Sequence, residues 1–303
     1  MYDIILSSID NYMLRRVITL NKDKIAILAD SGCDIPQDFL DKYEDVKLLG
    51  LKVIYGNDVY TDGVDMDPLM VYERFPENIP TTSTPSPGDI EDMLDNIKSE
   101  GYEKVIAICI SSKLSGTFNT VRNVLDSYED LDGFTLDTKN ISTGSGLIAM
   151  WCMKQIEAGA DYETLIGSLK KKVADSHVYF YMDTLDYLRK GGRIGNVTGI
   201  IGEKLKLKPV ITCDSNGVYK TVTMLRGSKN SIKKLTDIVR KNTDAEHIWL
   251  SVMNGNTPDK VDETKNSLRE KFPEADIVAD KQIVASLAVH TGPGLIGVGV
   301  LIL

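Results

Sequence analysis

The sequence has few of the residues that build metal centres and disulfide scaffolds. Its 303 residues include four cysteines and three histidines. The cysteines form no CxxC pair and no zinc pattern, and neither an HExxH motif nor a carboxylate–histidine cluster marks a metal site. We therefore predict no metal and no cofactor. Scattered, unpaired cysteines of this kind fit the reducing cytoplasm, where we expect the protein to reside.

The chain also lacks the familiar motifs of nucleotide and acyl chemistry. No GxxxxGK[ST] loop is present to cradle a phosphate, and no GxSxG segment could form a nucleophile elbow. The glycines that follow Asp137, at Gly144 and Gly146, have the wrong spacing for a dinucleotide-binding turn. These absences weigh against several large enzyme classes.

An excess of positive charge is missing as well. The 35 basic and 44 acidic residues leave a net charge of -9, so a nucleic-acid partner is not expected. No run of about 18 apolar residues occurs, so we predict no transmembrane helix and no stable membrane insertion. Residues 1–23 lack the pattern of a signal peptide and are predicted to be an extension ahead of the folded body.

What the sequence does contain is an alternation of strand and helix signals. Continuous apolar runs at 24–29, 46–54 and 105–110 predict buried strands, and the periodicity at 87–99, 116–127 and 144–157 predicts helices. This βαβ rhythm predicts a parallel, Rossmann-like sheet for an N-terminal domain at 24–175. An Asn-Gly hairpin signal at 209–225 and further strands predict a mixed-sheet α/β domain at 176–303.

Three polar segments, at 81–86, 111–117 and 290–294, place hydroxyl, glycine or histidine groups in predicted turns. The segment at 111–117 directly follows the apolar run at 105–110, which is a predicted strand. Ligands of open α/β sheets bind beyond the carboxyl ends of the strands. Neutral donors gathered at helix starts suit a carboxylate or phosphate that is bound and not cleaved. The segments therefore predict a binding site for a small anion.

The same segments are also compatible with roles that need no bound anion. Serine and threonine are preferred helix caps, although a cap needs only one of the four hydroxyls at 111–117. Segment 81–86 also fits a loop ahead of a helix. An enzyme, a hydrolase or transferase acting on a small acylated or phosphorylated substrate, could use Ser115 as nucleophile and His290 as base, but an orienting third residue is not evident. A ligand-responsive regulatory module is a further alternative.

A basic segment at 186–208 stands out in this acidic chain. It holds six basic residues and two acidic ones, a local charge of +6 − 2 = +4. It fits either a solvated face or a surface that docks an acidic partner. The basic residues are Arg189, Lys190, Arg193, Lys204, Lys206 and Lys208.

Taken together, these segments resemble the DegV family, the bacterial fatty-acid-binding proteins that include the FakB subunits of fatty acid kinase. The resemblance runs from about Lys24 to Leu303. Two departures are visible: Thr84 stands where the family usually has Gln, and residues 1–22 exceed the usual start. The matching motifs are DSGCDIP at 30–36, TTSTPS at 81–86, SSKLSGTFNT at 111–120, DTKNISTGSGL at 137–147, LRKGGRI at 188–194, LKPVI at 207–211 and HTGPG at 290–294.

The resemblance implies a long-chain fatty acid, such as palmitate, stearate or oleate, in a buried tunnel between two α/β domains. Transfer of a C16 tail from water into an apolar cavity would be favourable by about 12 kcal/mol of free energy, at roughly 0.8 kcal/mol per methylene. The carboxylate is then expected to be held by Thr82, Ser83, Ser115 and His290, with Thr81 and Ser112 as neighbours. Candidates for lining the tail are Ile108, Ile110, Phe118, Leu185, Ile194, Ile200, Ile201 and Leu205.

The resemblance also implies a partner. In FakB proteins the carrier presents the carboxylate to an ATP-dependent fatty acid kinase subunit, and the acyl phosphate feeds phospholipid synthesis. Such a carrier has no chemistry of its own, and we expect it to be a monomer. The residues that match regions implied in kinase docking are Arg189, Lys190, Arg193 and Arg226.

Overall fold

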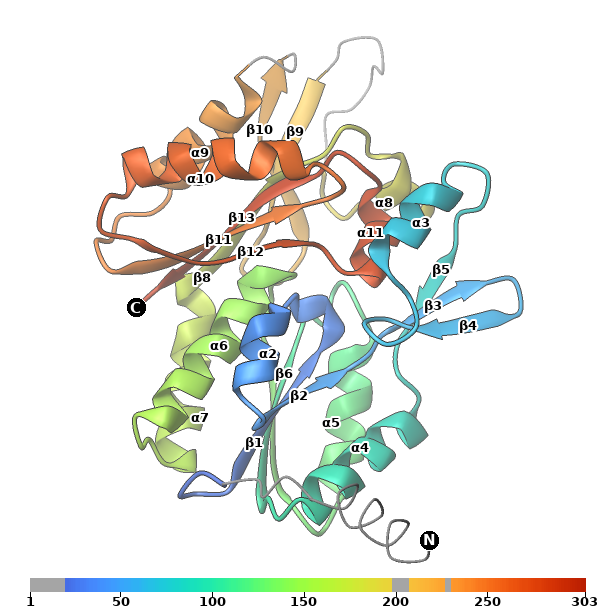
Figure 1. Ribbon diagram of the computed structural model, residues 1–303, viewed down its shortest axis with the longest axis vertical. Helices are drawn as coiled ribbons and strands as arrows, with labels where there is room; N and C mark the ends of the chain where they lie inside the picture. Colours follow the sequence, from blue (N-terminus) through green and yellow to red (C-terminus); the bar gives the residue numbers. More distant parts are fainter. Residues whose placement is uncertain (1–19, 198–206, 227–229) are drawn as a thin grey trace, which may run out of the picture.

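The computed structural model describes residues 20–197, 207–226 and 230–303 and arranges them around three sheets (Figure 1). The first is a four-stranded parallel sheet. Its strands, in spatial order, are β2 (Val46–Leu49), β1 (Ile25–Asp30), β6 (Lys104–Cys109) and β7 (Asp132–Asp137).

The second sheet is mixed and has six strands, all of which lie at or beyond Ser176. Only its β11–β12 pair is parallel among the pairs described. The order is β10 (Tyr219–Arg226), β9 (Leu207–Cys213), β8 (Ser176–Tyr181), β13 (Ile296–Ile302), β11 (Ile248–Asn254) and β12 (Asp276–Gln282).

A small antiparallel sheet projects from the side of the molecule (Figure 1). The small sheet contacts the short helix α11 (Ala285–Thr291), which in turn packs against α3 (Pro68–Arg74) and α8 (Asp186–Lys190). Its strands are β4 (Asp58–Thr61), β3 (Lys52–Tyr55) and β5 (Thr81–Ser83).

Side-chain alternation along β1 explains how helices cover both faces of the parallel sheet. Ile25, Ile27 and Ala29 pack in the core cluster that contains α6 (Thr143–Glu157), whereas Ala26 and Leu28 pack with α4 (Pro87–Ser99) and α5 (Thr117–Ser127). The remaining helices are α2 (Gln37–Lys42), α7 (Tyr162–Lys172), α9 (Ser231–Lys241) and α10 (Val261–Lys271), with 3-10 turns at Ser31–Cys33, Val173–Asp175 and Pro258–Lys260.

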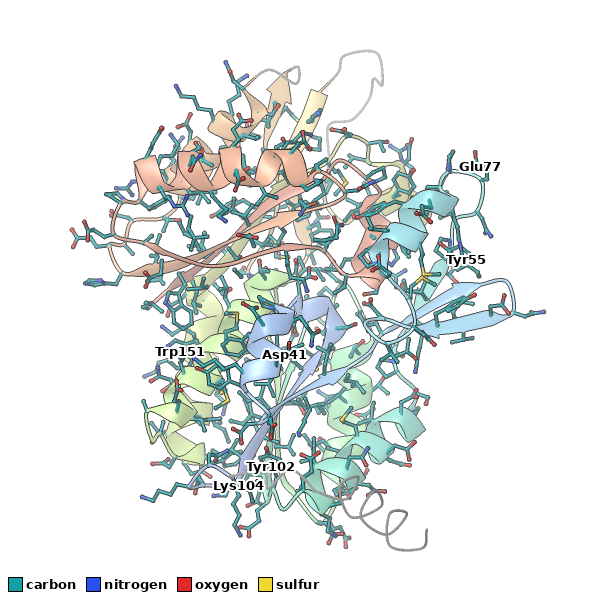
Figure 2. All side chains as sticks on the ribbon, viewed as in Figure 1. Asp41, Tyr55, Glu77, Tyr102, Lys104 and Trp151 are labelled. Carbon is teal, nitrogen blue, oxygen red and sulfur yellow. The ribbon has the colours of Figure 1, made fainter. Side chains whose placement is uncertain are left out.

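Helix α6 joins the two large sheets. It is apolar around most of its circumference, and it contacts β1 and β6 on one side and β8, β11 and β13 on the other. Gly146 allows this close packing, because an added Cβ would lie 2.2 Å from the carbonyl oxygen of Cys33. Side chains from both halves therefore fill the space between the sheets as one core (Figure 2).

The predicted α/β fold, with a parallel sheet followed by a mixed sheet, is confirmed. The predicted helices at 87–99 and 116–127 and the hairpin around Asn216-Gly217 also form. The domain boundary at residue 175 stays a prediction. Lys204, Lys206, Ile200, Ile201, Leu205 and most of the extension at 1–23 lie outside the described residues.

One strand prediction and one loop prediction were wrong in detail. The run at 46–54 is two strands in different sheets, because the chain turns at Gly50, where an added Cβ would lie 2.4 Å from the methyl group of Thr61. The segment at 81–86 does not form a loop throughout. Its first three residues form β5, which pairs with β3.

The prediction of a turn at His290 was also wrong, because His290 lies in the last helical turn of α11. Arg189 and Lys190 of the basic segment lie in the last helical turn of α8, where the N–H of Arg189 donates to the carbonyl of Leu185. In the part of the chain that the structure describes, no helix has both the length and the apolar character needed to cross a membrane.

Candidate functional site

A cavity lies where the parallel sheet, the mixed sheet and the small sheet meet α11. It contains about 720 Å³ of space between atoms, part of it open to solvent. Most of its wall is apolar: Leu51, Ile110, Leu114, Ile141, Val178, Phe180, Tyr219, Met253, Ile283, Leu287 and Leu295. Its polar lining is Thr82, Ser83, Ser115, Ser142, Arg193, Ser286, His290 and Thr291.

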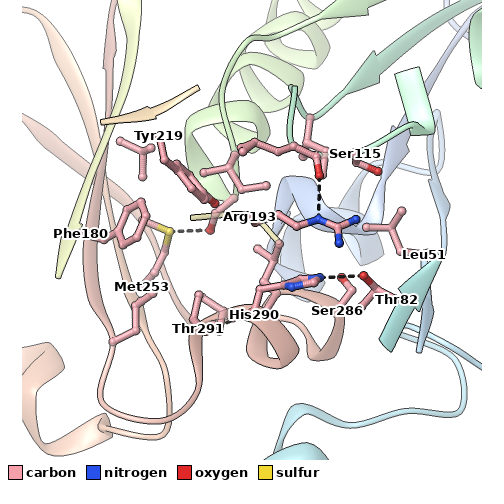
Figure 3. A pocket seen from close by; sticks show the side chains of 18 of the residues that line it. Leu51, Thr82, Ser115, Phe180, Arg193, Tyr219, Met253, Ser286, His290 and Thr291 are labelled. Atoms are coloured by element: carbon pink, nitrogen blue, oxygen red, sulfur yellow. Dashed lines mark hydrogen bonds between the residues drawn. The ribbon is translucent and has the colours of Figure 1, made fainter. Parts of the chain in front are cut away.

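Several of the polar groups gather at one place in this cavity, which we call the head region: Thr82, Ser115, Arg193 and His290 (Figure 3). They come from β5, the turn after β6, the segment after α8, and α11. The turns that follow β6 and the strand pairing of β5 bring these distant residues together. An apolar cavity with one polar region suits a ligand that has a hydrocarbon body and a polar end.

His290 and Thr82 form the central hydrogen bond of the head region. The ring Nε2 of His290 lies 2.7 Å from Oγ1 of Thr82, while Nδ1 is buried and has no hydrogen-bond partner among the described residues. Gly191 packs against that nitrogen so closely that an added Cβ would lie 2.1 Å from it. Desolvation, and then the nearby charge of Arg193, lower the pKa of His290 to about 4. The imidazole is therefore neutral at physiological pH.

Arg193 supplies a positive charge beside that neutral ring. Its Nε donates to the carbonyl of Leu114 at 3.3 Å, and its Nη1 donates to the carbonyl of Gly191 at 2.5 Å. None of the ion pairs within the described ranges includes this guanidinium. Two carbonyl oxygens orient the group but do not neutralise it, so the head region attracts an anion.

Ser115 has a structural role as well as a place in the cavity wall. Its Oγ lies 2.8 Å from Oγ1 of Thr117 and accepts a hydrogen bond from the Thr117 N–H at the start of α5. This hydrogen bond orders the turn ahead of α5, whose N-cap is Gly116 and has no side-chain cap. A structural role alone does not account for the whole arrangement, because Ser115 also lines the cavity.

The six predicted carboxylate ligands divide into two groups. Thr82, Ser83, Ser115 and His290 line the cavity, whereas Thr81 and Ser112 do not. Thr81 is exposed at the start of β5, and the hydroxyl of Ser112 donates to Asp137 at 2.6 Å. Which of them touches a ligand stays a prediction.

The residues proposed for partner docking also divide. Arg189 is exposed and pairs with Asp186 at 3.1 Å, and Lys190 is exposed. Arg193 instead turns into the head region. The side chain of Arg226 lies outside the described residues. Lys208, also in the basic segment, pairs with Asp183.

The candidates for the apolar lining divide between the cavity wall and the core. Of the described candidates, Ile110 lines the cavity, while Ile108, Leu185 and Ile194 belong to the surrounding core and Phe118 packs on the other face of the parallel sheet. Three polar lining residues, Ser142, Ser286 and Thr291, were not predicted from the sequence. The apolar run that leads to His290 could have indicated α11, which carries two of these three.

The arrangement does not form the nucleophile–base pair of the enzyme alternative. Nε2 of His290 is bonded to Thr82, and Oγ of Ser115 to Thr117. No carboxylate in the described part of the chain orients Nδ1 of His290. Nor do three His, Cys, Asp or Glu side chains within residues 20–197, 207–226 and 230–303 form a group that could hold a metal.

The fold and the cavity define a class of α/β protein with an apolar cavity between its sheets, and known proteins of similar sequence fall into the same class. The model of the DegV family, described as an uncharacterised protein family, matches residues 24–303. A DegV domain-containing protein of Clostridium acetobutylicum is 38% identical over 276 residues, which cover 91% of this chain and 98% of that protein. The chain belongs to the DegV family.

Solved structures show the same fold. A fatty-acid-binding DegV family protein of Thermus thermophilus superposes with a TM-score of 0.84 at 27% identity, covering 92% of this chain and 99% of that one. A stearic-acid-binding protein of Eubacterium ventriosum gives a TM-score of 0.83 at 28% identity, covering 91% and 98%.

Proposed function

We propose that this protein binds a long-chain fatty acid, such as palmitate, stearate or oleate, in the cavity between its sheets. The observation that carries the proposal is the combination of a largely apolar wall with one cationic, hydroxyl-rich head region. The ligands named for the relatives from Thermus thermophilus and Eubacterium ventriosum support the same class of ligand. The tail then supplies most of the affinity, at roughly 0.8 kcal/mol per buried methylene.

The head region would hold the carboxylate through complementary groups. The hydroxyls of Thr82 and Ser115 and the Nε2–H of a neutral His290 donate hydrogen bonds, and Arg193 provides the counter-charge. Ser83 lies within the same wall, and Thr81 and Ser112 support the neighbouring backbone. A buried carboxylate needs both kinds of contact, because burial without a charged partner is costly.

We further propose that the protein is a carrier and not an enzyme. It would present the carboxylate to an ATP-dependent fatty acid kinase subunit, whose acyl phosphate product enters phospholipid synthesis. The exposed basic residues Arg189 and Lys190 border the segment that carries Arg193 and are suited to an acidic partner surface. We expect the carrier to act as a cytoplasmic monomer without a bound cofactor.

The test separates the carrier from the hydrolase or transferase alternative. Purified protein loaded with radiolabelled oleate is incubated with ATP, alone and with a bacterial fatty acid kinase subunit. We expect acyl phosphate only in the complete mixture and unchanged oleate in the protein alone. Turnover by the protein alone, abolished by Ser115→Ala, would establish the enzyme alternative instead.

A further inference from the structure

Three aspartates are buried next to the cavity, and two of them contact α11. Asp30, Asp34 and Asp62 are exposed by only 1%, 0% and 1%. A buried carboxylate is tolerated only where hydrogen bonds or charges satisfy its oxygens. The partners of each aspartate therefore show which parts of the molecule it holds together.

Asp62 follows β4 and connects three elements of the chain. Its Oδ1 accepts a hydrogen bond from the N–H of Ala285 at 3.0 Å. Its Oδ2 accepts from the hydroxyls of Ser286 at 2.5 Å and Ser31 at 2.9 Å. The small sheet, the turn after β1 and the first turn of α11 are thus bound to a single carboxylate.

Asp34 makes a second connection to the same end of α11. Its Oδ1 accepts from the N–H of Val284 at 2.9 Å and lies 3.5 Å from Nζ of Lys281. The hydroxyl of Ser142 donates to its other oxygen. Asp34 takes a left-handed conformation with φ of 54° at the end of the 3-10 turn Ser31–Cys33. We call Asp34 and Asp62 the carboxylate clasp.

The clasp and the head region act on opposite ends of one short helix. Helix α11 has seven residues, too few to be stable without external contacts. Its first turn is held by the clasp, and its last turn carries His290, which is bonded to Thr82. Thr82 lies in β5 and Asp62 directly follows β4, so both contacts join α11 to the same small sheet.

We propose that the carboxylate clasp positions His290 for the fatty-acid carboxylate, by fixing the start of α11 on the small sheet and on the turn after β1. Asp34 and Asp62 do not line the cavity, so they act through α11 and not by touching the ligand. The assignment rests on the proposed function. The proposal goes beyond that function, because it assigns the positioning of the carboxylate to Asp34 and Asp62 and leaves the binding of the hydrocarbon tail to the cavity wall.

The experiment compares Asp62→Ala with Asp62→Asn in protein loaded with oleate that carries 13C at its carboxyl carbon. An asparagine side chain can still accept from the N–H of Ala285 and exchange hydrogen bonds with the two serines, so Asp62→Asn should preserve the geometry. We expect Asp62→Ala to shift the carboxyl resonance toward that of Thr82→Ala, while the oleate affinity stays within about tenfold of wild type. Asp62→Asn should restore the wild-type resonance.

Asp30→Asn is the matched control. Asp30 is equally buried, but its Oδ2 accepts from the N–H of Ile110, which directly follows β6, and not from α11. The substitution should lower the thermal stability without moving the carboxyl resonance. If Asp62→Ala fails to fold, Ser31→Ala, which removes one clasp contact and does not line the cavity, takes its place. A wild-type resonance in Asp62→Ala, with a shifted one in Thr82→Ala, would overturn the proposal.

If the proposed function is wrong, the wild-type protein takes up no oleate, and this result is distinct from a failure of the clasp proposal. The clasp is then tested in the empty protein through the 15N resonances of the His290 ring. We expect Asp62→Ala, but not Asp62→Asn or Asp30→Asn, to weaken the His290–Thr82 hydrogen bond. Unchanged ring resonances in Asp62→Ala would overturn the clasp on their own.

Discussion

At the scale of single residues, the charge in the head region belongs to Arg193 and not to His290. The ring of His290 is neutral because desolvation and the neighbouring guanidinium lower its pKa to about 4. The roles are therefore different. If a carboxylate binds as proposed, His290 and Thr82 would direct it through hydrogen bonds, and Arg193 would provide the electrostatic attraction.

Replacing Arg193 by glutamine should weaken oleate binding roughly tenfold to a hundredfold, because a hydrogen bond to a charged group contributes about 1.5–3 kcal/mol. The pKa of His290 should rise, since one of the two causes of its depression is removed. Calorimetric titration and histidine NMR measure the two effects. Arg189→Gln is the control, because Arg189 is exposed and outside the cavity, and it should leave both unchanged.

The low pKa of His290 also predicts a pH dependence of stability. Between pH 6.5, the ordinary pKa, and about 4, the unfolded chain binds a proton that the folded protein does not. The stabilisation by neutral His290 is complete above this window. It should be lost as the pH falls through the window, by up to about 3 kcal/mol.

The buried aspartates have the opposite effect on the pH dependence of stability. Desolvation raises the pKa of Asp30 to about 7 and also raises those of Asp34 and Asp62. The measurement is therefore the difference in unfolding free energy between delipidated wild type and His290→Gln. That difference should shrink as the pH falls from 6.5 to 4. Parallel curves over this range would show that His290 is not held neutral.

At the scale of elements, the site depends on the close approach of α8 and α11. Gly191 follows α8 and packs against the ring of His290, where a Cβ would lie 2.1 Å from Nδ1. Gly191→Ala should displace the ring, break its bond to Thr82 and weaken oleate binding roughly threefold to tenfold, the effect of one neutral hydrogen bond.

Gly167→Ala in α7 is the matched control for that methyl group. An added Cβ there meets no atom within 4 Å, so binding should not change and helix stability should rise by up to about 1 kcal/mol. Equal oleate affinities for Gly191→Ala and wild type would show that His290 has no part in the head region. Fluorescence competition with a labelled fatty acid gives both affinities.

The elements that the sequence could predict are those with a strong local signal. The apolar run of β6 and the periodic faces of α4 and α5 specify their own secondary structure. Strand β5 has no apolar alternation and forms because β3 offers a partner, which no local pattern reveals. Helix α11 was missed because its apolar run is short, and its position depends on Asp34 and Asp62, more than 200 residues away.

In the candidate site, too, some residues could be predicted from a local signal and others depend on distant contacts. The hydroxyl-rich turns and His290 could be singled out by their residue types. The inward position of Arg193 could not, because it depends on the carbonyl of Leu114, which is 79 residues away in the chain. For the same reason, the sequence alone could not separate lining from core among Ile108, Ile110 and Leu185.

At the scale of the whole molecule, one core connects the parallel and mixed sheets around α6, and the cavity is lined from both halves. A ligand in this cavity should therefore stabilise the molecule as a unit. At a free concentration of about 100 times Kd, oleate should add about 2.7 kcal/mol to the unfolding free energy of delipidated protein.

Thermal unfolding by calorimetry measures this stabilisation. Oleyl alcohol, which has the tail without the carboxylate, should stabilise the protein less than oleate at the same concentration. The difference should shrink in Arg193→Gln, which removes the counter-charge of the carboxylate. An equal effect of alcohol and acid on the wild type would rule out a carboxylate in the head region.

Whether the cavity holds a long-chain fatty acid can be read from native mass spectrometry of the purified protein, followed by denaturing extraction of what it carries. We expect an added mass that corresponds to one C14–C18 fatty acid, and its recovery in the extract. An empty protein that also takes up no added palmitate, stearate or oleate would refute the proposed function.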